Sequence, residues 1–369
     1  MTSSGDGKYR VGLIGCGRQG TGHGRAYMLN PMTELVAGAD TDPENLQLFR
    51  DRFNLPGYDN YQEMIEKERI DIVAPILPVR ANADIVVGSA EAGVKAIFCE
   101  KPLCASLEDA DRMVEACSSR GIPFAAGLVP RNQEPLWKAR EMIEAGEIGE
   151  VQSINLYHSS GQGGCRSVPV MRMFAHDASV EWVVGSVEGD PHSDEQTVTT
   201  GIGGYVKFTN GIDGFFHYKT GGPKVGVEVV GSRGIFASDW QSYHLWKISS
   251  ANSKDLVEVE GLFPDYRNHV RGYDDEGWQE IGPALQYAVQ SVVDALEKGT
   301  ETSCSGAQLR EALEIVIAMR ESARNGNSRV TLPLADRSLK IMPIPTRWNY
   351  KKEIKGVEWY RESMKAHKR

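Results

Sequence analysis

The feature that most constrains the fold is a glycine-rich turn that directly follows a short apolar run. The run YRVGLI, residues 9–14, is followed by GCGRQG, and the residues from Thr21 onward have the pattern of a helix. In such a turn Gly15 permits the tight strand-to-helix connection, Gly17 lets the backbone approach a pyrophosphate, and Gly20 allows close helix packing. The turn therefore predicts a dinucleotide-binding domain. Five residues are expected around the pyrophosphate: Gly15, Gly17, Arg18, Gln19 and Gly20.

A carboxylate at the end of the second apolar run supports this interpretation. Asp40 closes the run ELVAGAD, twenty residues beyond Gly20. A carboxylate at that position accepts hydrogen bonds from the hydroxyls of the adenosine ribose. It also repels a ribose 2′-phosphate, and no Lys or Arg follows it in ADTDPE. The sequence therefore predicts NAD, rather than NADP, as the cofactor.

The first 130 residues alternate apolar runs with amphipathic stretches. Five runs, from YRVGLI to PFAAGL, are separated by segments such as PENLQLFRDRF and LEDADRMVEACSSRG. Continuous apolar strands separated by helices are typical of a parallel sheet that helices cover on both faces. We therefore expect an N-terminal α/β domain with a parallel Rossmann sheet over residues 1–130.

Residues 131–340 have a different pattern. After a linker helix, strands are joined by turns, and the pair Asn210-Gly211 is a strong hairpin signal. Two long amphipathic helices follow. The first carries an apolar stripe over residues 285–296, and the second opens with a capping box that starts at Ser305. We expect an α+β domain for substrate binding and oligomerisation, with an open antiparallel sheet that both helices flank on one face.

Residues 341–369 form a C-terminal extension. It begins with the proline-rich segment IMPIPTRW and ends in a helix-like stretch rich in Lys and Arg. A solvated tail and an arm that packs on a neighbouring subunit through Trp348 and Trp359 are both compatible with this composition.

Composition excludes several classes of protein. A chain of 369 residues with 41% apolar and 25% charged residues has the size and composition of a two-domain globular protein. The net charge of −9 disfavours a nucleic-acid partner. The six cysteines lack metal-ligand spacing, so no metal site is expected. The polar N-terminus and the lack of a bilayer-length apolar run indicate a cytoplasmic protein with no membrane partner.

A second candidate site follows another apolar run. Glu100-Lys101-Pro102 comes directly after KAIFC, which places it at the carboxyl edge of the predicted sheet, where ligands bind in open α/β folds. A lysine that faces the nicotinamide could share a proton with a reacting hydroxyl, or hold its oxygen by a charge-assisted hydrogen bond. The alternative is a salt-bridged surface lysine.

Together these motifs resemble the Gfo/Idh/MocA family of sugar and inositol dehydrogenases. The likeness rests on VGLIGCGRQG, the ADTDPE strand end, the run that ends in IFCEKP, REMIEAGEIGEVQSI and CSGAQLREALEIVIAMRESARNG. It implies hydride transfer between nicotinamide C4 and a carbinol carbon of a sugar or polyol. It also implies a homo-oligomer, a dimer or tetramer, formed through the outer face of the C-terminal sheet. Lys101 matches the family's catalytic lysine.

The remaining cofactor contacts are expected around these motifs. Pro78 matches the loop proline under the cofactor, and Asn82 occupies a position where the family usually has His. The full set beyond the glycine-rich turn is Asp40, Thr41, Leu77, Pro78, Asn82, Glu100 and Lys101.

The family's second signature, D-x-x-x-H-x-x-D, is not intact. In one register Arg166 replaces the histidine, and Gln162 and Pro169 replace the two aspartates. We prefer this register because it keeps Gly164 before the key position and Arg172 after it without a gap. It predicts that Gln162 and Arg166 bind the substrate.

A second register uses His176-Asp177 as the histidine neighbourhood, with Arg172 and Ser179 at the aspartate positions. Without the family histidine, Lys101 could act alone or through a water, or His158 or His176 could serve as base. We take Lys101 and His176 as the catalytic candidates and add His158 to the substrate contacts. His23, on the first helix, is interpreted as packing beside the glycine-rich turn.

Three functions are compatible with these residues. The main hypothesis is an NAD-dependent dehydrogenase of a sugar, polyol or sugar derivative. The second is a redox-assisted glycosidase or lyase, in which bound NAD transiently oxidises C3 of the sugar and is then regenerated. The third is a cofactor-sensing binding protein without turnover.

Overall fold

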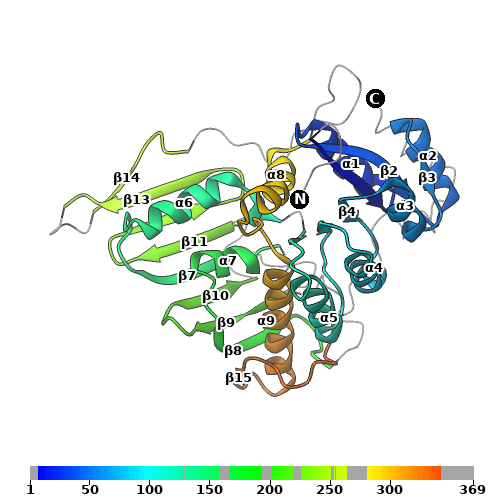
Figure 1. Ribbon diagram of the computed structural model, residues 1–369. Coiled ribbons are helices and arrows are strands. Elements are labelled where there is room, and N and C mark those ends of the chain that lie inside the picture. Colours follow the sequence, from blue (N-terminus) through cyan, green and yellow to red (C-terminus); the bar gives the residue numbers. More distant parts are fainter. Residues whose placement is uncertain are drawn as a thin grey trace.

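The computed structural model describes residues 7–127, 129–157, 166–192, 201–218, 226–250, 253, 255–263 and 281–341. Figure 1 shows two sheets side by side, with helix α9 (Gly306–Arg324) running between the second sheet and the helices of the first. Among the described residues, no helix is long and apolar enough to cross a membrane.

The first sheet is parallel and has the order β3-β2-β1-β4-β5-β6. Its strands are β1 (Tyr9–Ile14), β2 (Thr33–Ala39), β3 (Gly57–Tyr58), β4 (Ile72–Pro75), β5 (Ala96–Cys99) and β6 (Phe124–Ala126). Its helices are α1 (Arg18–Leu29), α2 (Pro43–Phe53), α3 (Tyr61–Glu68), α4 (Val79–Glu91) and α5 (Leu107–Ser118). The predicted Rossmann sheet is confirmed. The two-residue strand β3 and the helix α3 were not among the predicted elements.

The second sheet has nine strands in the order β14-β13-β12-β11-β7-β10-β9-β8-β15. The strands are β7 (Val151–Tyr157), β8 (Val180–Val187), β9 (Ile202–Phe208), β10 (Asp213–His217), β11 (Gly226–Gly231), β12 (Gly234–Ser238), β13 (Tyr243–Ile248), β14 (Leu256–Glu258) and β15 (Val330–Thr331). β7 and β10 pair in parallel, whereas the other neighbours are antiparallel. The sheet is therefore mixed rather than purely antiparallel.

The predicted hairpin joins β9 to β10. Gly211 has φ +92°, a value that favours glycine, and the Phe208 N–H bonds the Ile212 carbonyl across the turn. The capping box is also present, because the Ser305 hydroxyl accepts the Gln308 N–H and the Gln308 side chain accepts the Ser305 N–H.

The second part of the chain adds the 3-10 turn η1 (Pro130–Asn132) and the helices α6 (Glu134–Glu144), α7 (Val168–Phe174) and α8 (Pro283–Lys298). Helix α9 packs on β8 and β9 of the second sheet, as expected. Helix α8 does not pack there. Its residues Leu285, Val289 and Val292 share a core with Val11 and Leu13 of β1.

The expectation that both late helices cover the second sheet is therefore wrong for α8, which packs on α1 and on strands of the first sheet. An apolar stripe shows that a helix is buried on one face, but not which surface buries it. In consequence, a segment of the predicted range 131–340 belongs structurally to the Rossmann domain.

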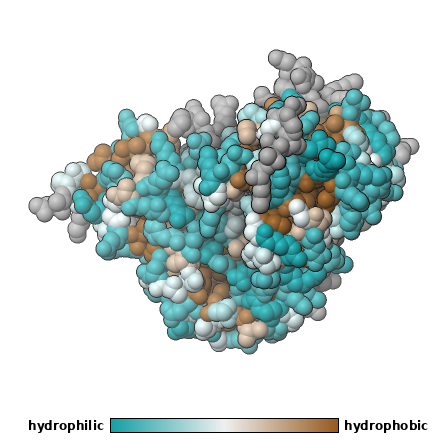
Figure 2. Space-filling view, viewed as in Figure 1, coloured by the Kyte–Doolittle hydropathy of each residue, from teal (hydrophilic) through white to brown (hydrophobic). Residues whose placement is uncertain are grey.

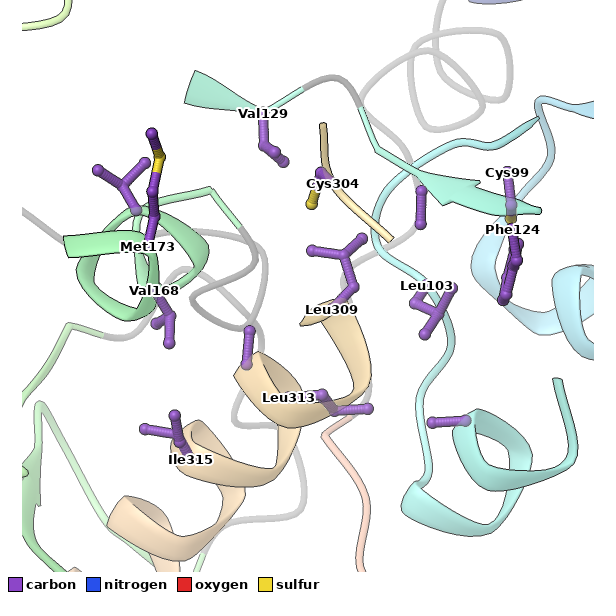
Figure 3. Close-up of a cluster of buried hydrophobic side chains, with 14 of the residues drawn as sticks. Cys99, Leu103, Phe124, Val129, Val168, Met173, Cys304, Leu309, Leu313 and Ile315 are labelled. Atoms are coloured by element: carbon purple, nitrogen blue, oxygen red, sulfur yellow. The ribbon is translucent and has the colours of Figure 1, made fainter. Parts of the chain in front are cut away.

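The two halves share one hydrophobic core. Figure 3 shows Leu309 and Leu313 of α9 between Leu103 on one side and Val168 and Met173 of α7 on the other. All five side chains are buried. Because close-packed interiors do not deform continuously, this core fixes α7 and α9 relative to the carboxyl edge of the first sheet.

The surface drawn in Figure 2 is largely hydrophilic, with an apolar patch around β14. Leu256 and Val257 on that strand are exposed. Of the predicted C-terminal extension, only Ile341 lies within the described residues, and it is buried.

Candidate cofactor and active site

The glycine-rich turn has a shape that only glycine permits. Gly15 follows β1 with φ +96°, and a Cβ added there would lie 2.3 Å from the Ile76 carbonyl oxygen. A Cβ on Gly20 would lie 2.0 Å from the Gly15 carbonyl oxygen. Both distances are well below van der Waals contact, so a side chain does not fit at either position. As glycines, the two residues allow the turn and the close helix packing that a dinucleotide site needs.

Two uncapped helices begin at this edge of the sheet. Helices α2, α3 and α5 carry side-chain caps from Asp42, Asn60 and Ser106. Within the described first domain, only α1 and α4 have no side-chain cap, and their N-cap residues are Gly17 and Pro78. The sheet order reverses between β1 and β4, the crevice where ligands bind in open α/β sheets. The amide groups there fit a pyrophosphate.

Asp40 lies directly beside this turn at the end of β2. Its Oδ2 accepts the Cys16 N–H at 2.8 Å, and its Oδ1 accepts the Asp42 N–H at 2.8 Å. The Asn45 side chain also donates to Oδ2 at 3.1 Å. The carboxylate is thus held at the edge of the turn, and its predicted contact with the adenosine ribose stays a prediction. Sequence reasoning had not singled out Asn45.

Lys101 occupies the neighbouring carboxyl edge. β5 ends at Cys99, so Glu100 and Lys101 follow the strand as predicted. Beside them, Gly127 ends β6 with φ +74°, and a Cβ added to it would lie 3.0 Å from Lys101 Cβ. The missing side chain at Gly127 leaves the room that the lysine occupies. Lys101 itself is half-buried.

Glu100 is buried beneath the lysine, with 7% of its surface exposed. One of its oxygens accepts the Lys101 main-chain N–H, and the other lies 3.5 Å from His23 Nε2. Burial opposes ionisation, but the charge of Lys101 and the proximity of His23 outweigh it and hold the pKa of Glu100 below its usual range. Sequence reasoning placed His23 beside the turn but not against this carboxylate.

Asn82 supports the same turn from inside the fold. It has no exposed surface, and its Nδ2 donates to the carbonyls of Pro102 at 3.0 Å and Leu103 at 3.1 Å. Asn82 therefore holds the main chain after Lys101, and its predicted contact with the cofactor stays a prediction. Thr41 and Pro78 are exposed and Leu77 is half-buried, as a contact surface requires.

The predicted substrate contacts fall in two groups. His158 and Gln162 lie outside the described residues. Arg166 is exposed just before α7. Arg172, which took part in both registers, is buried on α7, where it pairs with Glu311 of α9 and donates to the Asp177 carbonyl at 3.0 Å.

His176 lies at the end of α7 with φ +56° and a half-exposed ring. Its Nδ1 is 3.3 Å from Oε1 of Glu144 on α6. This contact links α6 to the turn after α7. The structure thus pairs His176 with Glu144, and the assignment of His176 as a catalytic base stays a prediction.

A buried ion pair next to His176 had no signal in the sequence. Arg131, 1% exposed, donates to both oxygens of Asp177 at 2.7 and 2.8 Å, and also to the carbonyls of Ser303 and Pro169. Arg140 donates to the same carboxylate at 2.9 Å. Burial opposes the charge on Asp177, but these arginines hold its pKa below the usual range. The pair joins η1 to the turn that follows α7.

Among the described residues, no group of three or more His, Cys, Asp or Glu side chains could hold a metal ion.

Comparison with known proteins agrees with this geometry. A family model described as an oxidoreductase family with an NAD-binding Rossmann fold matches residues 9–128. These residues match the Gfo/Idh/MocA family of oxidoreductases, the family that the motifs resemble. The resemblance predicted from the motifs and the NAD-binding domain are both confirmed.

Two relatives illustrate the range of similarity. Myo-inositol 2-dehydrogenase of Thermotoga maritima is 30% identical over 142 residues, 38% of this chain and 42% of that protein, so the match covers less than half of that relative's length. D-apiose dehydrogenase of Rhizobium rhizogenes is 24% identical over 339 residues, 86% of this chain and 95% of that protein.

A solved structure shows the same fold. An oxidoreductase from Agrobacterium radiobacter, in complex with NAD+, L-tartaric acid and magnesium, superposes with a TM-score of 0.71 at 22% identity. The alignment covers 88% of this chain and 98% of that one. The shared fold therefore extends over most of this chain.

Proposed function

We propose that the protein is an NAD-dependent dehydrogenase that oxidises a hydroxyl-bearing carbon of a sugar, polyol or sugar derivative. The observation that carries the proposal is the position of Lys101, half-buried at the carboxyl edge of β5 next to the dinucleotide crevice. The dehydrogenase names of the myo-inositol and D-apiose relatives support this substrate class.

Different residues of the chain bind the cofactor and transfer the proton. The amides of the glycine-rich turn bind the pyrophosphate, and Asp40 binds the adenosine ribose. When bound, NAD supplies the hydride acceptor. As a neutral amine, Lys101 Nζ takes or shares the proton of the substrate hydroxyl while the carbon is oxidised. As an ammonium it instead holds the substrate oxygen by a charge-assisted hydrogen bond, and the proton leaves through a water. The tight packing around Gly127 keeps the lysine stem in place.

The second domain supplies the substrate contacts. Arg166 presents a fork of donors suited to a substrate oxygen or carboxylate, and it stands with Gln162 and His158 as the proposed substrate-binding set. His176 is the alternative base. Because an arginine replaces the family histidine in the preferred register, Lys101 acts alone or through a water in the main form of this proposal.

A turnover assay with a substrate panel tests the function. The protein is incubated with NAD and with myo-inositol, D-apiose, and a set of aldoses and polyols, and the NADH absorbance band is followed together with products by mass spectrometry. We expect NADH and a carbonyl product in equal amounts from at least one compound. Product without net NADH would replace the proposal with the redox-assisted glycosidase or lyase. Tight NAD binding with no product would replace it with a sensing protein.

We further propose a homo-oligomer, a dimer or tetramer, through the outer face of the second sheet. A row of aromatic side chains supports this: Trp182 and Tyr205 lie 5.0 Å apart, Tyr205 and Phe215 5.3 Å, and Tyr157 and His217 5.1 Å, measured between ring centroids. Their rings are only half-buried. Light scattering after gel filtration should show a dimer or tetramer that Phe215→Asp converts to monomer. A monomeric wild-type protein would contradict the proposal.

We place the protein in the cytoplasm, with a small-molecule substrate and no nucleic-acid or membrane partner. The net charge of −9 disfavours binding to phosphate backbones. Cys16, Cys99, Cys104 and Cys117 are buried thiols outside any disulfide, which fits a reducing compartment.

A further inference from the structure

A buried histidine lies behind the proposed catalytic lysine. His23, on α1, is 2% exposed and packs edge-on against Phe98 of β5 at 5.2 Å between ring centroids. Across the part of the chain that the structure describes, neither of its ring nitrogens has a formed hydrogen bond. Buried polar nitrogens are rarely left without a partner, so the position of this ring calls for an explanation.

The nearest polar group to the ring is the carboxylate of Glu100. His23 Nε2 lies 3.5 Å from Glu100 Oε1, while Glu100 Oε2 accepts the main-chain N–H of Lys101. The two oxygens of one buried carboxylate thus connect the imidazole to the backbone of the lysine. Hydrogen bonds in catalytic networks are often long before ligands bind and tighten in the complex.

Both sides of the lysine are then held from within the domain. The side chain of Asn82, on α4, donates to the carbonyls of Pro102 and Leu103, which follow the lysine. The side chain of Glu100 accepts the main-chain N–H of Lys101 itself. Only 7% of the surface of Glu100 is exposed, so its charge needs a partner inside the protein. His23 is placed to provide a donor.

We propose that His23 is a positioning residue for Lys101. Its Nε2–H donates to Glu100 Oε1, keeps that carboxylate ionised and oriented, and through the Glu100–Lys101 N–H bond fixes the lysine against the reacting carbon. Because His23 is buried, it touches neither cofactor nor substrate. The proposal rests on the role of Lys101 in the proposed function.

Two substitutions separate the donor from the ring. His23→Phe keeps an aromatic ring against Phe98 but removes the N–H, whereas His23→Gln keeps a donor. With NAD and the compound of the panel that is turned over fastest, we expect His23→Phe to lower kcat by about 10- to 100-fold, since small misplacements of a catalytic group have effects of this size. The Kd for NAD should change by less than about threefold, since the buried ring makes no contact with the cofactor. His23→Gln should recover most of kcat.

His23→Phe in a Glu100→Gln background tests whether His23 acts on Lys101 through the Glu100 carboxylate. Since His23 acts through the carboxylate, His23→Phe should lower kcat little further once Glu100 is replaced. The proposal would be overturned if His23→Phe lowered kcat equally in the wild-type and Glu100→Gln backgrounds. It would also be overturned if His23→Gln had no higher kcat than His23→Phe, or if His23→Phe lost affinity for NAD to the same extent as kcat.

Hydrogen exchange supplies a readout that needs no activity. Fragmentation of peptides that cover residues 99–104 resolves the exchange of the Lys101 N–H from that of the Leu103 N–H, and Pro102 between them has no amide. We expect this amide to exchange faster in His23→Phe than in the wild type and to stay slow in His23→Gln. Unchanged exchange in His23→Phe would refute the positioning role. If a Lys101 variant proved fully active, the proposed function would fail while this exchange result still decided the role of His23.

Discussion

Asp40→Asn should weaken NAD binding and narrow the preference for NAD over NADP. In the structure both carboxylate oxygens are in use, Oδ2 with the Cys16 N–H and Oδ1 with the Asp42 N–H, each at 2.8 Å. An asparagine has one acceptor oxygen, so it cannot keep both amides and still hold a ribose hydroxyl. A hydrogen bond to a charged group contributes about 1.5–3 kcal/mol. At about 1.4 kcal/mol per factor of ten, the Kd for NAD should rise about 10- to 100-fold.

The affinity for NADP should fall less, because the substitution also removes the repulsion between the carboxylate and a 2′-phosphate. Fluorescence titration with both cofactors gives the ratio, which should move toward NADP by about tenfold. Asp42→Asn is the matched control, since it removes one charge nearby but keeps the oxygen that caps α2 at 3.0 Å. Asp42 is half-buried at the surface, where a charge contributes about 0–1 kcal/mol, so the control should change the Kd by less than about fivefold. An unchanged NAD-to-NADP ratio in Asp40→Asn would refute the reasoning.

Two further substitutions test the walls of the site. Asp177→Asn should lower the free energy of unfolding in urea by about 3 kcal/mol at neutral pH, because it leaves the Arg131 guanidinium buried without its charge partner. The pKa of Asp177 is lower in the folded state than in the unfolded state. The stability that Asp177 contributes is therefore fully present above the unfolded-state pKa and is lost as the pH falls through the folded-state pKa. A difference in unfolding free energy between wild type and Asp177→Asn that stays constant below about pH 4 would contradict this prediction. Gly127→Ala should lose about 1–2 kcal/mol from its positive φ and also lower kcat, because its Cβ would press on Lys101. Gly146→Ala has φ +87° in open space and should lose stability without losing kcat; equal kcat losses in the two variants would count against the contact.

The parts of the fold and site that could be predicted are those encoded over short stretches of chain. The glycine-rich turn and Asp40 are set by the first strand, helix and second strand, and the alternation of apolar runs with amphipathic helices determines a parallel sheet. The position of Glu100-Lys101 at the carboxyl edge follows because every strand of such a sheet ends on the same side.

The parts that could not be predicted depend on contacts between distant segments. Arg131 and Asp177 are 46 residues apart, and no local pattern links them. The contact of His23 with Glu100 joins α1 to the residue after β5, and β4 lies between β1 and β5 in the sheet. Likewise, the apolar stripe of α8 predicted burial, but only the folded structure shows that it packs on α1.

The central claim is that Lys101 handles the proton of the reacting hydroxyl, and Lys101→Met tests it most directly. Methionine keeps an unbranched apolar stem and removes the ammonium. With the fastest substrate of the panel, NADH formation should fall by at least about 100-fold, within the range that general acid–base groups contribute. The Kd for NAD, measured by fluorescence titration, should stay within about threefold of the wild type, because the turn and Asp40 carry the binding. A Lys101→Met protein that forms NADH at the wild-type rate would contradict the account.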